Sequence, residues 1–377
     1  MALVRSQVAA VAPVVLRWAR ESAGFTQEEA ADRLGVGPDR LARAEAGERP
    51  LTLVQVRKAA HVYQRPLAVL FLPEPPSEEP QEVQFRRLRD APQLPWSPAM
   101  RALAREVPAL QDEVDALFEA IDEEPRWIEA AKQLLSDVPI ERLAERLRQV
   151  VGVTLEQQKT SARTDPQGFK TFRLWREAVE DLGILVLQDG SLSLGDMRGF
   201  ASPHARVPAI VINTNDDVRA RLFTMIHELA HVFWSALTES EFEELAGTTL
   251  MPSSSFADDF RRANGASLLE KIDATARLYG TTPDATAVRV GWLNLASWND
   301  VRDARAEIRN RGGSGSRAQG GNYYRNVIAR MGPRLVGRIL DAVGQAAISD
   351  LAAARVLGVR VERLESVRRE LGSPDVA

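Results

Sequence analysis

FTMIHELAHVFW, at residues 223–234, is the stretch that decides the fold and the chemistry of this chain. His227 and His231 are four residues apart in it, so a helix places both on one face. Two imidazoles so placed can hold one metal ion, and Glu228 can reach a water molecule beside that ion. Apolar neighbours recur at helical spacing and predict a packed face. The pattern predicts a metal-binding HExxH helix; the alternative is a helix with two ordinary histidines and a surface glutamate.

Composition sets the frame for this motif. A chain of 377 residues, 45% of them hydrophobic, is expected to form two or three domains. It has no cysteine, so a zinc ion would have to be held by histidine and carboxylate. A cysteine-free chain suits a reducing compartment, and neither a secretory signal nor a long apolar run is evident. We therefore expect a cytoplasmic protein without a membrane partner.

Charge is distributed unevenly along the chain. The whole sequence has a net charge of -4, which gives no general attraction to nucleic acid. Residues 1–72 alone carry ten Lys or Arg against seven Asp or Glu. This local positive excess permits DNA binding at the N-terminal end without requiring it.

The N-terminal segment has the punctuation of a small helical bundle. Thr26 followed by Glu29 is a capping box, and Gly35-Val36-Gly37 predicts a tight turn between two short helices. Proline at the start of a helix and glycine after its end mark the other boundaries. The pattern predicts four helices, near residues 13–21, 26–34, 38–46 and 53–63.

Residues 17–72 resemble the XRE class of helix-turn-helix domains, the lambda-repressor or Cro type. The resemblance rests on AGFTQEEAADRLGV at residues 23–36 and LARAEAGERP at residues 41–50. It implies that the second helix of the pair reads bases in the major groove and that such domains often act as homodimers. The residues at the contact positions are Asp39, Arg40 and Arg43, with Gln27 near the phosphates. A bundle used only for protein contacts is the alternative.

The middle of the chain changes from helical to strand periodicity. Residues 73–95 are rich in proline and acidic residues and predict a linker, whereas 98–150 have helical spacing. Further on, the pattern predicts a helix at 175–182, a strand at 184–187, a loop at 190–204 and a strand at 209–213. A small sheet before the HExxH helix predicts an α+β fold that is mostly α, with a zincin-like domain and a helical C-terminal region.

Several segments of this region resemble the ImmA/IrrE family of metallopeptidases. They are PAIVIN at 208–213, RARLFTMIHELAH at 219–231 and LMP at 250–252. The tail, GGNYYR at 320–325 with AAARVLGV at 352–359, looks like that of longer members that begin with an XRE domain. The resemblance implies a bacterial or phage regulator that couples DNA binding to zinc-dependent cleavage of a repressor-like protein partner.

The expected site contains Glu228 as the catalytic base and His227 and His231 as zinc ligands. The third ligand is open. The family register relative to the LMP segment indicates Glu239, whereas a helix that turns and folds back favours Glu243 or Glu244. Glu241 is a further carboxylate of this cluster, and a site without a third ligand is the remaining possibility.

Two positions depart from the family pattern, which has a small residue and an asparagine where this chain has Phe242 and Glu243. His204, in a Ser-Pro-His loop, is a candidate donor to an oxyanion or an ordinary loop histidine. A Gly- and Ser-rich linker is predicted at 309–321, followed by a second helix-turn-helix-like pattern at 352–370.

We expect four parts in this chain. They are an XRE-type domain at 1–72, a linker at 73–95, a peptidase domain with preceding helices at 96–255 and a helical region at 256–377. The leading interpretation is a regulatory zinc endopeptidase. The alternative is a DNA-binding regulator or antitoxin-like protein whose peptidase domain is degenerate.

Overall fold

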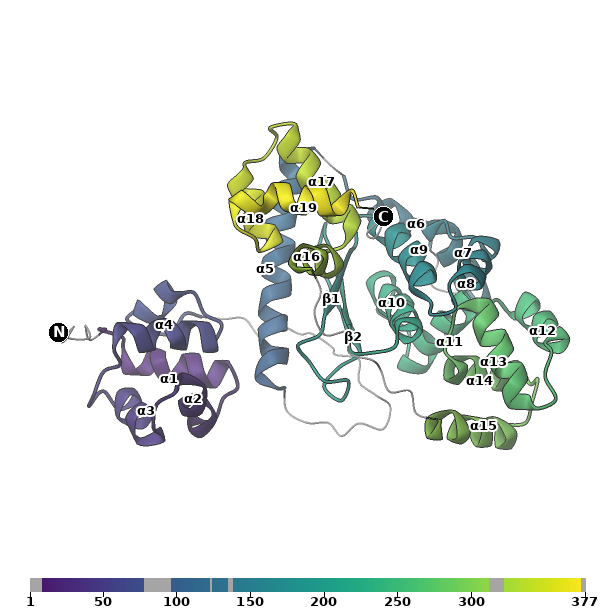
Figure 1. The fold of residues 1–377 in the computed structure, drawn as a ribbon, viewed down its shortest axis with the longest axis horizontal. Coiled ribbons are helices and arrows are strands. Elements are labelled where there is room, and N and C mark those ends of the chain that lie inside the picture. The colour runs from purple at the N-terminus through teal and green to yellow at the C-terminus, as the bar shows by residue number, and fades with distance from the viewer. Residues whose placement is uncertain (1–8, 78–95, 123, 135–137, 312–321, 374–377) are drawn as a thin grey trace. The chain divides into compact units, whose positions relative to one another are not determined.

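The computed structural model describes residues 9–77, 96–122, 124–134, 138–311 and 322–373. These residues form two compact units, one with the described residues up to 106 and the other with those from 107 onward. Most of both units is helical, and a small sheet lies in the second (Figure 1). No helix of the described residues is long and apolar enough to span a membrane.

The first unit is built from short helices around one apolar core. Thr26 and Glu29 form the predicted capping box, and Gly35 ends the second helix in the left-handed conformation with φ 67°. The elements are α1 (Pro13–Ser22), α2 (Gln27–Leu34), α3 (Pro38–Glu45), α4 (Leu53–Val62) and a 3-10 turn at Leu67–Phe71. These helices confirm the predicted N-terminal bundle.

A buried ion pair joins α1 to α3. Arg20 Nε lies 2.7 Å from Glu45 Oε1, and Arg20 Nη2 lies 3.0 Å from Glu45 Oε2. The hydrogen bond to Glu45 is the largest of the effects that raise the pKa of Arg20. Gln27, at the start of α2, also donates to Glu45 Oε2 at 3.1 Å. Glu45 therefore ties three helices together.

Helix α5, Pro98–Ala120, contains the division between the two units. The helices that follow it, with bounds in chain order, are α6 (Arg126–Lys132), α7 (Ile140–Val151), α8 (Leu155–Thr164), α9 (Phe169–Glu180), α10 (Val218–Phe233), α11 (Glu239–Leu250), α12 (Ser253–Arg262), α13 (Leu268–Tyr279), α14 (Pro283–Trp292) and α15 (Trp298–Asn310). The helix predicted at 175–182 is α9, which begins six residues earlier, at Phe169.

The sheet has three strands in the order β1-β3-β2: β1 (Leu185–Asp189), β2 (Gly199–Ser202) and β3 (Ala209–Asn213). β1 pairs with β3 in parallel, and β2 pairs with β3 antiparallel. The prediction of loop throughout 190–204 is wrong at β2. This short strand has little local signal because it is defined by pairing with the fully buried β3.

One apolar core extends from the sheet through the helices that surround it. Ile210 and Ile212 of β3 share it with Trp175 of α9 and with Met225 and Ile226 of α10, all fully buried. The same core continues through α11 to α14 and ends at Ala304 of α15. The HExxH helix therefore lies within the core, as the apolar face of its sequence predicts.

The C-terminal helices are α16 (Tyr323–Met331), α17 (Pro333–Gly344), α18 (Asp350–Leu357) and α19 (Leu364–Leu371). α16 packs along β1 (Figure 1), and α18 and α19 are the two helices of the pattern predicted around Gly358. Most of the linkers predicted at 73–95 and 309–321 lies outside the described residues.

A buried ion pair of α9 anchors this C-terminal region. Arg176 Nε lies 2.7 Å from Glu180 Oε1, and Arg176 Nη1 donates to the carbonyl oxygen of Ala329 at 2.8 Å. Glu180 Oε2 accepts from the backbone N–H of Arg334 at 3.2 Å. Gly332, between α16 and α17, has φ +96°, and a Cβ built there would lie 2.2 Å from Glu180 Oε1. Only glycine allows the carboxylate of Glu180 to approach so closely.

Candidate metal centre

Helix α10 carries the first part of the site. Asp217 caps its N-terminus by accepting from the backbone N–H of Arg219 at 2.9 Å. His227 is 0% exposed and Glu228 1% exposed, whereas the side chain of His231, one turn later, is 25% exposed. The motif therefore runs from the core toward solvent, and its partly open end is at His231.

The beginning of α11 brings a carboxylate back to these histidines. Thr238 caps α11, and its side chain and backbone N–H both hydrogen-bond to Glu241 Oε2 at 2.7 Å. These hydrogen bonds to Thr238 lower the pKa of Glu241 and hold its carboxylate at the cap. Glu239 lies in the same first turn and is 64% exposed at its side chain. The carboxylate of Glu241 is therefore held at the cap, whereas the carboxylate of Glu239 lies next to His227.

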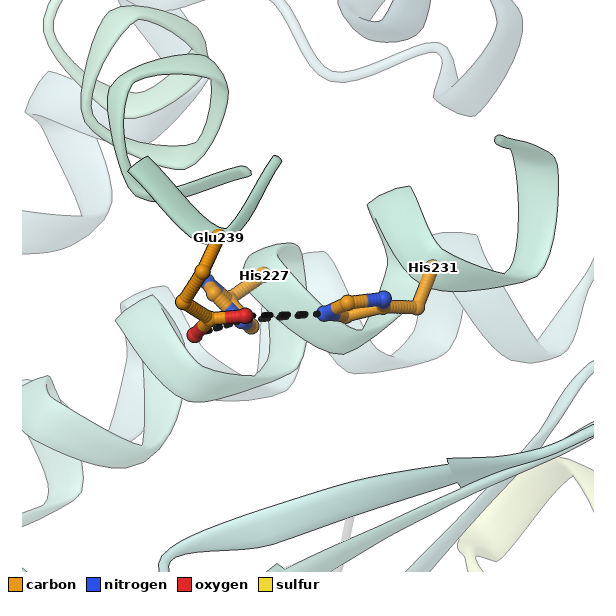
Figure 2. A group of neighbouring side chains, drawn as sticks. All are labelled: His227, His231 and Glu239. Carbon is orange, nitrogen blue, oxygen red and sulfur yellow. Dashed lines mark hydrogen bonds and ion pairs between the residues drawn. The ribbon is translucent and has the colours of Figure 1, made fainter. Parts of the chain in front are cut away.

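Three side chains, two imidazoles and one carboxylate, converge between the two helices (Figure 2). His227 Nε2 lies 3.2 Å from His231 Nε2 and 3.2 Å from Glu239 Oε1. His231 Nε2 lies 3.8 Å from Glu239 Oε2. The described residues contain one group of at least three His, Asp or Glu side chains that could hold a metal ion, and its members are His227, His231 and Glu239.

The geometry of this group suits zinc. Zinc bonds of about 2.0–2.2 Å in a tetrahedron place neighbouring ligand atoms about 3.3 Å apart. The 3.2 Å separations between His227 Nε2 and its two neighbours match this requirement, and the separation between His231 Nε2 and Glu239 Oε2 is wider, at 3.8 Å. Two imidazoles and one carboxylate are also a ligand set of catalytic zinc sites, which keep a fourth position open. The side chains present fit a zinc ion.

The other two carboxylates considered for the third ligand are not part of this group. Glu244 acts electrostatically on Arg289, which is 1% exposed and whose pKa falls to about 10 chiefly because of burial. Glu243 follows Phe242 on α11, one residue beyond the ring that packs against His231. The short connection between α10 and α11 therefore suffices for a carboxylate of the first turn, Glu239, to reach the histidines.

Strand β2 lies beside the motif. A Cβ built on Gly199 would lie 2.5 Å from Thr224 Cγ2 and 3.5 Å from Glu228 Cγ, so the strand backbone passes close to α10. β2 is at one edge of the sheet, next to β3. Sequence reasoning assigned this segment to a loop; the glycine at 199 was the one available signal of a close backbone approach.

Buried polar groups hold the far end of α11. Arg148 Nη1 donates to the carbonyl oxygen of Thr249 at 2.7 Å, and Gln158 Nε2 donates to that of Leu250 at 3.0 Å. Arg289 Nε donates to the carbonyl oxygen of Met251 at 3.1 Å. Burial lowers the pKa of Arg148 to about 10. Sequence reasoning missed these residues because their partners are more than 30 positions away.

His204 has a role within its own loop. Its Nδ1 accepts from the backbone N–H groups of Arg206 at 3.2 Å and Val207 at 3.0 Å. Its Nε2 lies 3.5 Å from Asp112 Oδ1. These contacts shape the turn between β2 and β3 and leave Nε2, which faces Asp112, as the ring nitrogen that can donate. The oxyanion role of His204 stays a prediction.

The residues predicted to contact DNA lie on two helices of the first unit. Asp39 and Arg43 are exposed on α3, and Arg43 Nε lies 3.9 Å from Glu48 Oε2. Arg40 is half-buried and donates to the carbonyl oxygens of Arg49 and Pro50. Arg43 is therefore the positively charged side chain that is exposed among these three residues of α3.

Comparisons with known protein families gave one match in the N-terminal helical bundle and one in the region of the HExxH helix. A helix-turn-helix family model matches residues 16–70, and the model of the IrrE N-terminal-like domain, a peptidase family, matches residues 179–290. The second match contains β1 to β3, the HExxH helix and α11. No curated protein and no solved structure matched the chain. Residues 16–70 are thus similar to helix-turn-helix domains, and residues 179–290 are similar to the IrrE N-terminal-like domain.

Proposed function

We propose that this protein is a regulatory zinc endopeptidase that binds DNA through its N-terminal domain and cleaves a repressor-like protein partner. The observation that carries the proposal is the convergence of His227, His231 and Glu239 next to Glu228. The two family matches support the pairing of the domains. We place this activity in the cytoplasm, where a DNA-binding regulator meets both targets.

In this proposal His227, His231 and Glu239 hold the metal. A zinc ion held this way supplies Lewis acidity toward a peptide carbonyl and makes water more acidic. Glu228 accepts a proton from the attacking water and delivers it to the leaving amine. Its burial at 1% exposure keeps bulk water from competing for that proton. Hydrolysis consumes one water and needs no other reactant.

The edge strand β2 would orient the substrate. An extended peptide can add to a sheet edge by backbone hydrogen bonds, and β2 passes next to Glu228. Pairing along this edge would place a peptide bond near the metal and the base. Selection of one protein partner would then depend on an extended segment of that partner.

The DNA-binding part of the proposal rests on α2 and α3. Asp39, Arg40 and Arg43 are at the positions where helix-turn-helix domains contact bases, and Gln27 is near the phosphate positions. A homodimer on paired half-sites is the proposed assembly, since one such domain contacts few base pairs. The exposed guanidinium of Arg43 is the best placed of these groups for DNA.

The test compares zinc-loaded wild-type protein with the Glu228→Gln variant in a native extract of the cells that produce it. New protein N-termini are identified by terminal labelling and mass spectrometry. We expect cleavage products with the wild type that fall by about 10²- to 10⁴-fold with the variant. Equal zinc content in both proteins is the control. Identical N-terminal profiles would favour the degenerate, DNA-binding regulator instead.

A further inference from the structure

An aromatic side chain that the proposed chemistry does not use lies against the metal centre. The ring of Phe242 packs on the imidazole of His231, with 3.7 Å between ring centroids and 35° between planes. Its centroid is also 5.9 Å from that of His227. Phe242 is 3% exposed, although the ring that it covers belongs to a partly exposed histidine.

The three candidate ligands are not equally constrained. His227 is 0% exposed, so the packed core limits its rotamers. His231 stands near the C-terminal end of α10 with 25% of its side chain exposed, and the side chain of Glu239 is 64% exposed. An exposed side chain samples several rotamers and loses that freedom when it binds a metal. The partly exposed His231 and the exposed Glu239 therefore need support from neighbouring groups.

Phe242 is placed to support both. It follows Glu239 by three residues, so the two side chains share one face of α11. Burial of the Phe242 ring fixes the first turn of α11 against α10, and the same ring covers one side of the His231 imidazole. One apolar contact thus sets the approach of the carboxylate and the orientation of the second imidazole.

We propose that Phe242 is a positioning residue of the metal centre, which holds His231 and Glu239 in the arrangement that binds the ion. This inference rests on the proposed zinc site and adds a residue to it. Groups that orient metal ligands typically change metal affinity by about 10- to 100-fold when they are replaced. The contact is with the aromatic ring, so a side chain of similar size without a ring is expected to fail.

The test measures zinc affinity of the full chain by competition with a chromogenic chelator. We expect Phe242→Leu to weaken zinc binding by about 10- to 100-fold and Phe242→Tyr, which keeps the ring, to stay within about threefold of wild type. Phe242→Met is a second ringless variant, because its flexible side chain fills a similar space. Circular dichroism of the metal-free proteins identifies any variant that fails to fold.

Phe260→Leu is the matched control. Phe260 is a buried phenylalanine of α12 at 5% exposure, stacked on Phe256 with 6.2 Å between centroids. Its replacement removes a ring from the same core and is expected to leave zinc affinity unchanged. The absorption spectrum of bound Co²⁺ gives a second readout, since ligand geometry determines its bands; we expect it to change with Phe242→Leu and Phe242→Met and not with Phe260→Leu.

The outcomes separate this inference from the function on which it rests. Wild-type protein that binds zinc, together with folded Phe242→Leu and Phe242→Met variants of unchanged affinity and Co²⁺ spectrum, would overturn the role of Phe242 and leave the metal centre intact. Equal losses in Phe242→Leu and Phe260→Leu would also overturn it, because general packing would then explain both. Wild-type protein that binds no zinc would overturn both proposals.

Discussion

Glu45 illustrates how one residue can hold a recognition helix in place. Glu45 is 3% exposed as a residue. Its carboxylate receives two hydrogen bonds from Arg20 and one from Gln27, and so joins α3 to α1 and α2. The resemblance to XRE-class domains implies that Gln27 lies near the phosphates of bound DNA. The structure adds an internal partner, so a phosphate contact by this amide would compete with its bond to Glu45.

Replacing Glu45 by alanine is expected to destabilise α3 strongly. Loss of Glu45 leaves the buried guanidinium of Arg20 with only the exposed Glu21 as an ion-pair partner among the described residues, and breaking a buried pair costs up to about 3–5 kcal/mol. Hydrogen exchange of the α3 amides in the full chain measures this as a fall in the free energy of local opening. Glu48→Ala is the control, because Glu48 and its partner Arg43 are 65% and 62% exposed. Equal protection in the two variants would show that the buried pair does not stabilise α3.

Helix α3 is the element to which DNA recognition is assigned. Arg43→Ala is expected to lower DNA affinity and, if the contact is to a phosphate, to reduce the slope of log affinity against log salt by about one. Fluorescence anisotropy with a duplex of random sequence at several salt concentrations measures both. Arg57→Ala, at an exposed position of α4, should leave the slope unchanged. Equal affinities together with equal slopes for wild type and Arg43→Ala would remove Arg43 from the interface.

Elements were predictable where their signals are local. The Thr26–Glu29 capping box defines α2, and the apolar spacing around His227 defines α10. β2 was not predictable, since pairing with β3 determines it. The third member of the His group was left open because the sequence contains several glutamates in one cluster. The Thr238–Glu241 capping box is a local signal, but which glutamate faces the histidines depends on how α11 folds back on α10.

At the scale of the molecule, partly buried polar contacts join the C-terminal helices to the rest of the second unit. Arg176 reaches the carbonyl oxygen of Ala329, and Glu180 receives the backbone N–H of Arg334. Burial raises the pKa of Glu180, and the positive charge of the nearby Arg176 offsets part of this rise. These contacts join positions more than 150 residues apart, so no sequence pattern indicated them.

Gly332→Ala is expected to loosen this attachment. The new Cβ would lie 2.2 Å from Glu180 Oε1, at a backbone φ of +96° that side chains rarely adopt. Limited proteolysis of the full chain should release fragments of residues 322–373 at least about tenfold faster than in wild type, as for a local loss above 1.4 kcal/mol. Gly337→Ala in α17 is the control, because the new Cβ would lie 3.8 Å from Leu371 Cδ2, which is an ordinary van der Waals distance. Matching rates for the two variants would contradict this account of Gly332.

The order of the domains along the chain is supported by observation, whereas their exact limits stay predictions. The two family matches and the two compact units support a DNA-binding part followed by a peptidase-family part. The limits at residues 72, 95 and 255 stay predictions, as does a linker whose residues 78–95 lie outside the described structure.

The metal content of the purified full chain tests the central claim most directly. The protein is loaded with zinc, desalted and measured by atomic emission beside the His231→Ala variant, with circular dichroism to show that both are folded. The account predicts about one zinc ion per wild-type chain, since three ligands and an open position form one catalytic site, and a large loss in the variant. A wild-type chain without zinc, or a folded variant with equal zinc, would contradict it.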